Sequence, residues 1–240
     1  MLLKGYTAVV TGANSGIGEA AAHKLAREGA NLLIAGRRED KNQQVADAIN
    51  ASYCVDALPV KSDVSREVDC VRLLQQAKER FGRLDILINN AGTIDKKAVA
   101  DLETEAFDAV LKTNLYGAFW CAREASRLMR ENELAENGLR GYIINISSIV
   151  GKEAWEETTP YSTSKFGMMA LNGALAEEGK AHRIKSTAIC PAMVATPMPG
   201  VSGPEYIQPE DIAETILYLL RLSHASWPTE IVIPRRGSES

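Results

Sequence analysis

The feature that most constrains the fold is a short apolar run followed by a glycine-rich turn and a helical pattern. Residues 7–10 favour a strand that ends at Gly12, and Gly16 and Gly18 open a helical pattern that continues to Gly29. A turn of this kind lets the backbone approach a phosphate with no Cβ in the way, while the helix N-terminus directs its N–H groups toward the anion. The spacing differs from the more common Gly-x-Gly-x-x-Gly fingerprint. Taken by itself, the pattern indicates either a nucleotide-binding turn or a structural loop.

Strand-like and helical patterns alternate along the rest of the chain. A nearly continuous apolar run, typical of a strand covered on both faces, spans residues 84–88. Further strands are expected at residues 31–35, 57–61, 141–146, 184–190 and 231–233, with helical patterns at 39–49, 65–81, 104–129, 160–179 and 209–220. Such alternation predicts an α/β fold with a Rossmann-like, doubly wound, seven-stranded parallel sheet flanked by helices. With 45% hydrophobic residues, the chain is expected to form a single domain over residues 1–240.

The overall charge and the lack of long apolar runs argue against several classes of partner. A formal net charge of -4 is unlike a nucleic-acid-binding surface, which rests on clustered Lys and Arg. No apolar run reaches the ~18 residues that a membrane span needs, and the first residues lead directly into a strand-like run without a charged leader. The Cys and His residues are scattered, with no pair at metal-ligand spacing. We therefore expect a cytoplasmic protein with no metal, nucleic-acid or membrane partner.

The residues after the second expected strand bear on the choice of nucleotide. In dinucleotide-binding folds an acidic residue near this point accepts hydrogen bonds from the adenosine ribose, whereas an arginine accommodates a 2′-phosphate. Here the strand is followed by Gly36, Arg37 and Arg38. Guanidinium groups bind phosphate through planar, charge-assisted hydrogen bonds. The pattern favours NADP(H) over NAD(H); the alternative is that both arginines are solvated and paired with Glu39 and Asp40.

A Tyr and a Lys four residues apart indicate a site for proton transfer. Pro160 is expected to open a helix at its first turn, which puts Tyr161 and Lys165 on one helical face. A nearby cation favours the phenolate and is expected to lower the pKa of the tyrosine from its reference value of ~10. Ser148 adds a hydroxyl that can hold a substrate oxygen. The alternative is a Tyr ring packed beneath the Lys side chain, which is the more frequent meaning of this spacing on its own.

Two further segments are expected to border this site. Asn114 lies among apolar residues of a helical pattern and is expected to be partly buried, with hydrogen-bond partners. Residues 192–208 are rich in Pro, Gly and Ser, which is typical of a mobile lid rather than of regular structure. Met193 and Met198 in this segment, together with Trp155, indicate a partly apolar substrate pocket.

Taken together, the motifs resemble those of the classical short-chain dehydrogenase/reductase family along nearly the whole chain. They are T-G-A-N-S-G-I-G at residues 11–18, N-N-A-G at 89–92, the context of Asn114, I-S-S at 146–148 before Y-S-T-S-K at 161–165, and C-P-A-M-V-A-T-P-M at 190–198. The resemblance implies an NADP(H)-dependent oxidoreductase. Such an enzyme would transfer hydride between the nicotinamide and a small or medium ketone, aldehyde or secondary alcohol.

The resemblance also implies a role for each matching residue. Tyr161 would be the general acid in reduction and the base in oxidation, and Lys165 would bind the nicotinamide ribose and lower the Tyr161 pKa. Ser148, rather than Ser147, would orient the substrate, and Asn114 would hold a water in a proton relay to Lys165. The implied cofactor site has Gly12, Gly16, Ile17 and Gly18 around the pyrophosphate, Arg37 at the 2′-phosphate, Asp63 and Val64 at the adenine, Asn90, Ala91 and Gly92 on the adenosine side, and Val194 and Thr196 at the carboxamide, together with Asn14, Ser15, Arg38, Tyr161, Lys165 and Pro191.

Three features depart from the family pattern. Ala192 stands where Gly is usual after Pro191, and its methyl is expected to lie near the nicotinamide. Ser15 occupies a position that is often basic in NADP-preferring members, so the cofactor preference rests on Arg37 and Arg38. The end of the chain lacks the glycine-ended tail that is common in the family.

The family resemblance further implies a homodimer or homotetramer formed through the helical patterns at 104–129 and 160–179. Two rival functions stand beside the oxidoreductase at this point. One is an NADPH-binding regulatory or scaffold protein with little turnover, which would commonly lose Tyr161 or Lys165. The other is a family member that acts on a sugar or lyase substrate, which would usually carry a longer substrate domain. The sequence retains both Tyr161 and Lys165, and its 240 residues leave no room for a longer substrate domain.

Overall fold

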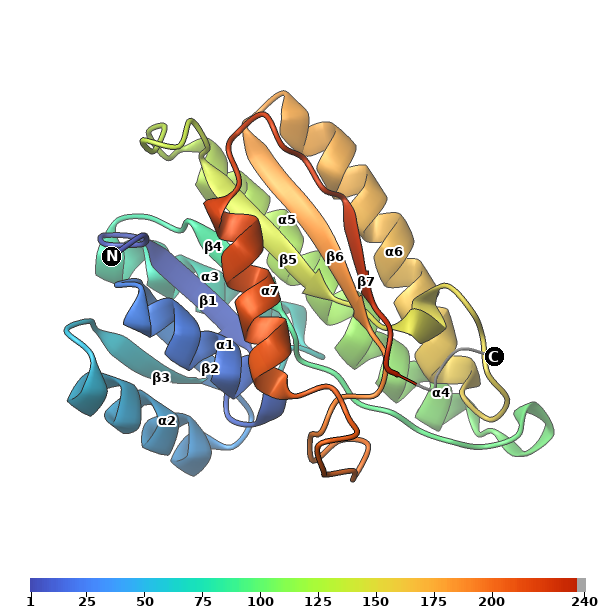
Figure 1. Cartoon of the computed structure of the whole chain (residues 1–240). Helices are drawn as coiled ribbons and strands as arrows, with labels where there is room; N and C mark the ends of the chain where they lie inside the picture. The colour runs from blue at the N-terminus through green and yellow to red at the C-terminus, as the bar shows by residue number, and fades with distance from the viewer. Residues whose placement is uncertain (237–240) are drawn as a thin grey trace.

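A seven-stranded parallel sheet forms the centre of the computed structural model, which describes residues 1–236 (Figure 1). The strands are β1 (Thr7–Thr11), β2 (Asn31–Gly36), β3 (Ala57–Lys61), β4 (Ile86–Asn89), β5 (Gly141–Ile146), β6 (Ile184–Pro191) and β7 (Glu230–Ile233), in the order β3-β2-β1-β4-β5-β6-β7. The order reverses between β1 and β4, and in open α/β sheets ligands bind outside the carboxyl ends of the strands at this reversal. The predicted Rossmann-like fold is confirmed.

Helices cover both faces of the sheet (Figure 1). They are α1 (Gly16–Arg27), α2 (Glu39–Ser52), α3 (Glu67–Phe81), α4 (Thr104–Leu111), α5 (Gly117–Arg130), α6 (Thr159–Lys180) and α7 (Pro209–Arg221), with the short turns η1 (Val99–Asp101), η2 (Lys112–Tyr116) and η3 (Ile149–Gly151). α1, α2 and α7 lie on one face, and α3, α5 and α6 lie on the other. Each inner strand is therefore buried on both sides, which explains the continuous apolar runs in the sequence.

The alternation of side chains along β1 divides the core into two layers. Ala8 and Val10 pack in the cluster that includes residues of α1, α2 and α7, whereas Val9 packs in the cluster of α3 and α5. This is the period of two that a strand imposes on its side chains. The two layers fix the strands relative to the helices that follow them, and so position the loops at the carboxyl edge.

Two elements differ from the sequence prediction. The helix expected over 104–129 is interrupted by a π-helical turn, η2, between α4 and α5. β4 begins at Ile86 rather than at residue 84. Just before it, the N–H of Asp85 donates to the carbonyl of Thr7 at 2.9 Å, and the Asp85 side chain accepts the N–H of Thr7 at 2.9 Å and pairs with Arg83. Asp85 thus joins the start of β4 to β1 through both its backbone and its side chain.

The segment at 192–208 contains no helix or strand, as its composition predicts, but residues near its two ends are hydrogen-bonded to each other. Val194 and Ile207 form an isolated β-bridge, and the N–H of Ala195 donates to the carbonyl of Ile207 at 2.8 Å. Farther out, Arg235 lies over the ring of Tyr206, 5.3 Å from its centroid. The mobility of this lid stays a prediction. So does the single domain over residues 1–240, whose last four residues, part of the unusual tail, lie outside the described range.

Candidate active site

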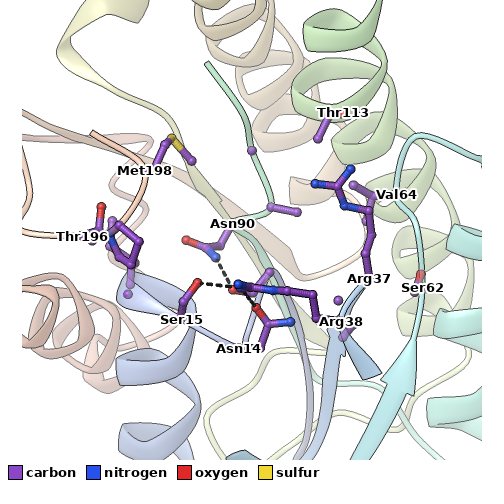
Figure 2. A pocket seen from close by; sticks show the side chains of 18 of the residues that line it. Asn14, Ser15, Arg37, Arg38, Ser62, Val64, Asn90, Thr113, Thr196 and Met198 are labelled. Carbon is purple, nitrogen blue, oxygen red and sulfur yellow. Dashed lines mark hydrogen bonds between the residues drawn. The ribbon is translucent and has the colours of Figure 1, made fainter. Parts of the chain in front are cut away.

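A cleft lies at the carboxyl ends of β1 to β4, where the sheet order reverses (Figure 2). It is lined by Gly12, Asn14, Ser15, Gly16, Ile17, Ala35, Gly36, Arg37, Arg38, Ser62, Asp63, Val64, Asn90, Ala91, Gly92, Thr113, Thr196, Pro197 and Met198. Thirteen of these residues are among those expected from the sequence to bind a cofactor. The structure therefore brings together residues from four strand ends and from the lid.

The glycine turn is shaped by contacts that leave no room for side chains. Gly12 and Gly16 have positive φ angles of 64° and 56°, and a Cβ on Gly16 would lie 2.9 Å from Cγ2 of Thr196. Asn90 holds the turn against β4, since its Nδ2 donates to the carbonyls of Thr11 and Gly12 at 2.9 and 3.2 Å. The turn thus presents backbone at the N-terminus of α1, a cradle suited to an anionic pyrophosphate.

The two arginines after β2 take different directions. Arg38 lies toward the glycine turn, and its Nη2 donates to Oδ1 of Asn14 at 2.6 Å and to Oγ of Ser15 at 3.4 Å. Arg37 extends on the other side, near Val64 (Figure 2). Within residues 1–236 neither arginine forms an ion pair, so the alternative in which Glu39 and Asp40 neutralise them is not found. Both guanidinium groups line the cleft.

The far end of the cleft contains a buried hydroxyl without a partner in the described structure. Oγ of Ser62, at the end of β3, makes no hydrogen bond within residues 1–236 although Ser62 lines the cleft. Its neighbour Asp63 accepts the N–H and hydroxyl of Ser65 at 3.0 and 2.8 Å, which orders the loop. An unsatisfied polar atom is costly to bury. A polar group of a bound nucleotide would satisfy it.

Sequence reasoning missed Asn42, which lies behind the cleft in α2. Its side chain is fully buried and contacts Asn14, Gly36 and Val60 through hydrogen bonds. The available signal was the neighbouring Val45, Ala46 and Ile49, which define the buried face of α2. A polar residue one turn before Val45 on such a face needs buried partners.

The proton-transfer group lies at the start of α6, beside the cleft. Tyr161 hydrogen-bonds Ser148, which is buried at the end of β5. Ser147 contacts the carbonyl of Lys165 at 3.4 Å and the thiol of Cys190 instead. The geometry therefore distinguishes the two adjacent serines, and Ser148 is the one beside the phenol.

The pKa of Tyr161 differs from the sequence expectation. Burial raises this pKa above its ordinary value of 10.0, and the hydrogen bond with Ser148 lowers it by less. The expected lowering by Lys165 is not found. The Nζ of Lys165 lies 5.5 Å from the centroid of the Tyr161 ring and donates to the carbonyl of Ile146 at 2.7 Å, and burial lowers its own pKa to about 8.

Asn114 is fully buried in the π turn η2, more deeply than expected. Its Oδ1 accepts the N–H of Thr93 at 2.8 Å, and its Nδ2 donates to the carbonyl of Thr93 at 2.8 Å and to Oγ of Ser164 at 3.1 Å. The side chain thus joins the loop after β4 to α6. Because both N–H groups of the amide donate to protein groups, a water held by Asn114 could only donate a hydrogen bond to it. π-helical turns are frequent at functional sites.

Five expected cofactor residues do not line this cleft in the described structure: Gly18, Tyr161, Lys165, Pro191 and Val194. Gly18 lies behind the glycine turn, where a Cβ would overlap the carbonyl oxygen of Gly12. Pro191 and Val194 are buried at the base of the lid. Ala192 is buried too, with its N–H bonded to Ile233 at 2.9 Å.

Comparison with known proteins identifies the family. Residues 6–206 match the family model for short chain dehydrogenase. The chain belongs to the short-chain dehydrogenase family. Short-chain dehydrogenases are oxidoreductases that bind a nicotinamide cofactor, and both statements therefore hold for this protein.

Individual short-chain dehydrogenases and related oxidoreductases resemble the chain over most of its length. An uncharacterized oxidoreductase of Staphylococcus aureus (strain MRSA252) is 37% identical over 216 residues, which cover 89% of this chain and 90% of that protein. An alcohol dehydrogenase from the archaeon Thermococcus sibiricus, complexed with 5-hydroxy-NADP, is 26% identical with a TM-score of 0.87 and coverage of 95% of both chains. A metagenomic short-chain oxidoreductase in complex with NADP is 29% identical with a TM-score of 0.85, covering 98% of this chain and 99% of that one.

Two absences expected from the sequence, of a membrane-spanning helix and of a metal site, can be compared with the structure of this short-chain dehydrogenase. Over residues 1–236, no helix is long and apolar enough to cross a bilayer. Within the same residues, no three His, Cys, Asp or Glu side chains are grouped as metal ligands. The cytoplasmic location expected from the sequence stays a prediction.

Proposed function

We propose that this protein is an NADP(H)-dependent oxidoreductase that transfers hydride between the nicotinamide and a carbonyl or secondary alcohol, with Tyr161 as the general acid or base. The observation that carries the proposal is the group formed by Tyr161, Ser148 and Lys165 beside a cleft that contains two arginines. When bound, the cofactor would supply or accept the hydride. The protein residues would bind it, orient the substrate and move the proton.

The cleft offers groups that fit an NADP(H) molecule. The glycine turn fits the pyrophosphate, because Gly12 and Gly16 have backbone conformations and neighbours that exclude a Cβ. Arg37 and Arg38, without carboxylate partners in residues 1–236, would bind the 2′-phosphate by charge-assisted hydrogen bonds. The hydroxyl of Ser62, which has no hydrogen-bond partner within residues 1–236, would find an acceptor or donor on the adenosine half. The NADP complexes of related enzymes agree with this choice.

The raised pKa of Tyr161 suits it to donate a proton in the reducing direction. At neutral pH the phenol is protonated, because burial raises its pKa. Ser148, hydrogen-bonded to Tyr161, would hold the carbonyl oxygen of the substrate, and Tyr161 would give its proton to that oxygen as negative charge develops on it. Lys165 would bind the ribose hydroxyls and, when protonated, favour the resulting phenolate. Asn114 would support the relay that returns a proton.

The adenine, the carboxamide and the substrate would be contacted by other residues of the cleft and the lid. Asp63 and Val64 would contact the adenine and Thr196 the carboxamide, since all three line the cleft. Val194, which is buried at the base of the lid and does not line the cleft, is the other proposed carboxamide contact. Met198, exposed beside Gly92, would contact the substrate. Met198 gives the substrate side an apolar group. We propose a small or medium ketone, aldehyde or secondary alcohol as the substrate.

We also propose that two or four copies of the chain associate through α5 and α6. Tyr116, Phe119 and Phe166, which lie on η2, α5 and α6, are 49%, 40% and 44% exposed. Large apolar side chains on neighbouring helices are typical of an interface. A molar mass from light scattering of one chain, rather than two or four, would contradict this part of the proposal.

The test of the function is NADPH absorbance loss across a panel of ketones, aldehydes and 3-oxoacyl thioesters, with NADH in parallel. Turnover with NADPH is expected, and Tyr161→Phe should reduce it by about 10²-fold to 10⁴-fold while NADPH still binds. Tyr218→Phe, a change of the same kind at an exposed position of α7, serves as the control. A better rate with NADH would contradict the NADP(H) preference. NADPH binding without turnover on any substrate would instead support a regulatory or scaffold protein.

A further inference from the structure

Asn42 uses every polar atom of its side chain in the space behind the cleft. Nδ2 donates to the carbonyl of Gly36 at 2.8 Å and to the carbonyl of Val60 at 2.9 Å. Oδ1 accepts Nδ2 of Asn14 at 2.7 Å. The residue is fully buried, so these partners are not exchanged for water. It joins α2 to the ends of β2 and β3 and to the glycine turn.

These bonds fix the orientation of Asn14. Because both N–H groups of Asn42 are directed at strand carbonyls, Asn42 can offer Asn14 only an acceptor. Asn14 must therefore present its NH₂ group to Asn42, and its Oδ1 is left facing Arg38, whose Nη2 donates to it at 2.6 Å. A flipped Asn14 would place oxygen against oxygen on one side and NH₂ against guanidinium on the other.

The same pair of amides occupies the space beside Gly36. A Cβ at this position would overlap Nδ2 of Asn14 and lie 2.8 Å from Oδ1 of Asn42. Position 36 is the end of β2, where a carboxylate would receive the ribose hydroxyls of a cofactor without the 2′-phosphate. The Asn14–Asn42 pair thus excludes such a carboxylate while it holds an arginine in the cleft.

We infer that Asn42 is a positioning residue for cofactor selection, which acts through Asn14 to hold Arg38 where it recognises the 2′-phosphate of the nucleotide. This rests on the NADP(H) preference proposed above. Asn42 does not line the cleft, so it would act on the nucleotide only through Asn14 and Arg38. Its effect is to order the Arg38 guanidinium before the ligand arrives, which reduces the entropy lost on binding.

The experiment measures binding of nucleotide fragments to the full chain by calorimetry, with no substrate or turnover. The probes are 2′,5′-ADP and 5′-AMP, which share adenosine and the 5′-phosphate and differ only in the 2′-phosphate. The variants are Asn42→Ala, Arg38→Ala and the double variant. Asn50→Ala is the matched control, because Asn50 also joins α2 to β3, through the N–H and carbonyl of Ala57 at 2.8 and 3.0 Å, without touching Asn14.

Asn42→Ala is expected to weaken 2′,5′-ADP binding about fivefold, the equivalent of one ordered hydrogen bond, and to leave 5′-AMP binding unchanged. In the Arg38→Ala background the same change should have no further effect, because the contact it positions is gone. Asn50→Ala should leave the ratio of the two affinities as in the parent protein. Asn42→Ser, whose hydroxyl is too short to reach Asn14, replaces Asn42→Ala if that variant does not fold.

The outcomes separate this inference from the proposed function. Equal binding of the two fragments by the parent protein would overturn the NADP(H) preference and the inference with it. Preferential 2′,5′-ADP binding that Arg38→Ala abolishes and Asn42→Ala leaves intact would overturn the inference alone. So would equal weakening of both fragments by Asn42→Ala, since that is the behaviour of a residue that only stabilises the fold.

Discussion

Lys165 donates its Nζ–H to the carbonyl oxygen of Ile146 at 2.7 Å, which fixes the amine of a helix residue against the last residue of β5. Lys165 is buried, and within residues 1–236 no carboxylate pairs with it. Burial accordingly lowers the pKa of Lys165 from 10.5 to about 8, while the nearby Cys190 opposes this in part. The amine is thus close to its titration range at physiological pH, before any cofactor hydroxyl is bound to it.

The first prediction concerns stability against pH. The unfolded chain holds the Lys165 proton up to pH 10.5, whereas the folded chain holds it only up to about 8, so unfolding takes up a proton between these values. Stability from this residue therefore rises as the pH increases through that window. In urea unfolding without cofactor, the free energy of unfolding of the parent protein should increase by up to about 3 kcal/mol, relative to that of Lys165→Met, between pH 8 and 10.5. A constant difference across the window would show that Lys165 is charged when folded.

The adjacent serines give the second prediction. Ser148 hydrogen-bonds Tyr161, whereas Ser147 contacts the backbone carbonyl of Lys165 and the thiol of Cys190. Ser148→Ala should lower kcat by about 10²-fold or more, because it removes a donor to the oxygen on which charge develops. Ser147→Ala changes no group that faces the substrate and should leave kcat within about threefold. Steady-state rates with saturating NADPH make the comparison, and the reverse order of effects would assign the substrate oxygen to Ser147.

Much of the fold could be predicted because each element carries its own signal. Apolar runs of strand length, separated by helical periodicity, define a parallel sheet, and the topology then places the ends of β1 to β4 at one edge. Tyr161 and Lys165 could be placed on one helical face because Pro160 lies in the first turn of α6. The glycine turn before α1 could likewise be predicted from a local sequence pattern.

The parts that could not be predicted depend on contacts between distant segments. The bonds of Asn42 to Asn14 and Val60 arise only after β2 and β3 are paired. The pKa of Tyr161 was expected to fall because sequence spacing shows the neighbouring cation but not the burial, which has the larger effect. The π turn around Asn114 is likewise set by its partners, Thr93 and Ser164, which lie 21 and 50 residues away.

Asn114 leads to the third prediction. Asn114→Ala would leave the N–H and carbonyl of Thr93 without their side-chain partners, and Ser164 without one of its own. The free energy of unfolding should fall by about 2–3 kcal/mol, since these groups are buried or partly buried. Ser164→Ala is the comparison variant: it removes the contact with Asn114 and the bond from Oγ of Ser164 to the carbonyl of Tyr161, but keeps both bonds to Thr93, and should cost about 1 kcal/mol. Equal losses in urea unfolding would mean that the bonds to Thr93 contribute little.

The fourth prediction uses two helical glycines to separate packing from ligand contact. A Cβ on Gly18 in α1 would overlap the carbonyl oxygen of Gly12, whereas a Cβ on Gly173 in α6 would meet no atom of the described part of the chain within 4 Å. Gly18→Ala should therefore destabilise the fold by about 1–3 kcal/mol through overpacking, and Gly173→Ala should stabilise it by up to about 1 kcal/mol through the helix propensity of alanine. Thermal unfolding of the cofactor-free protein measures both. If Gly18→Ala kept its stability and lost only nucleotide affinity, Gly18 would contact the pyrophosphate directly. A loss of stability in the absence of ligand would show instead that Gly18 shapes the glycine turn by letting α1 pack against it.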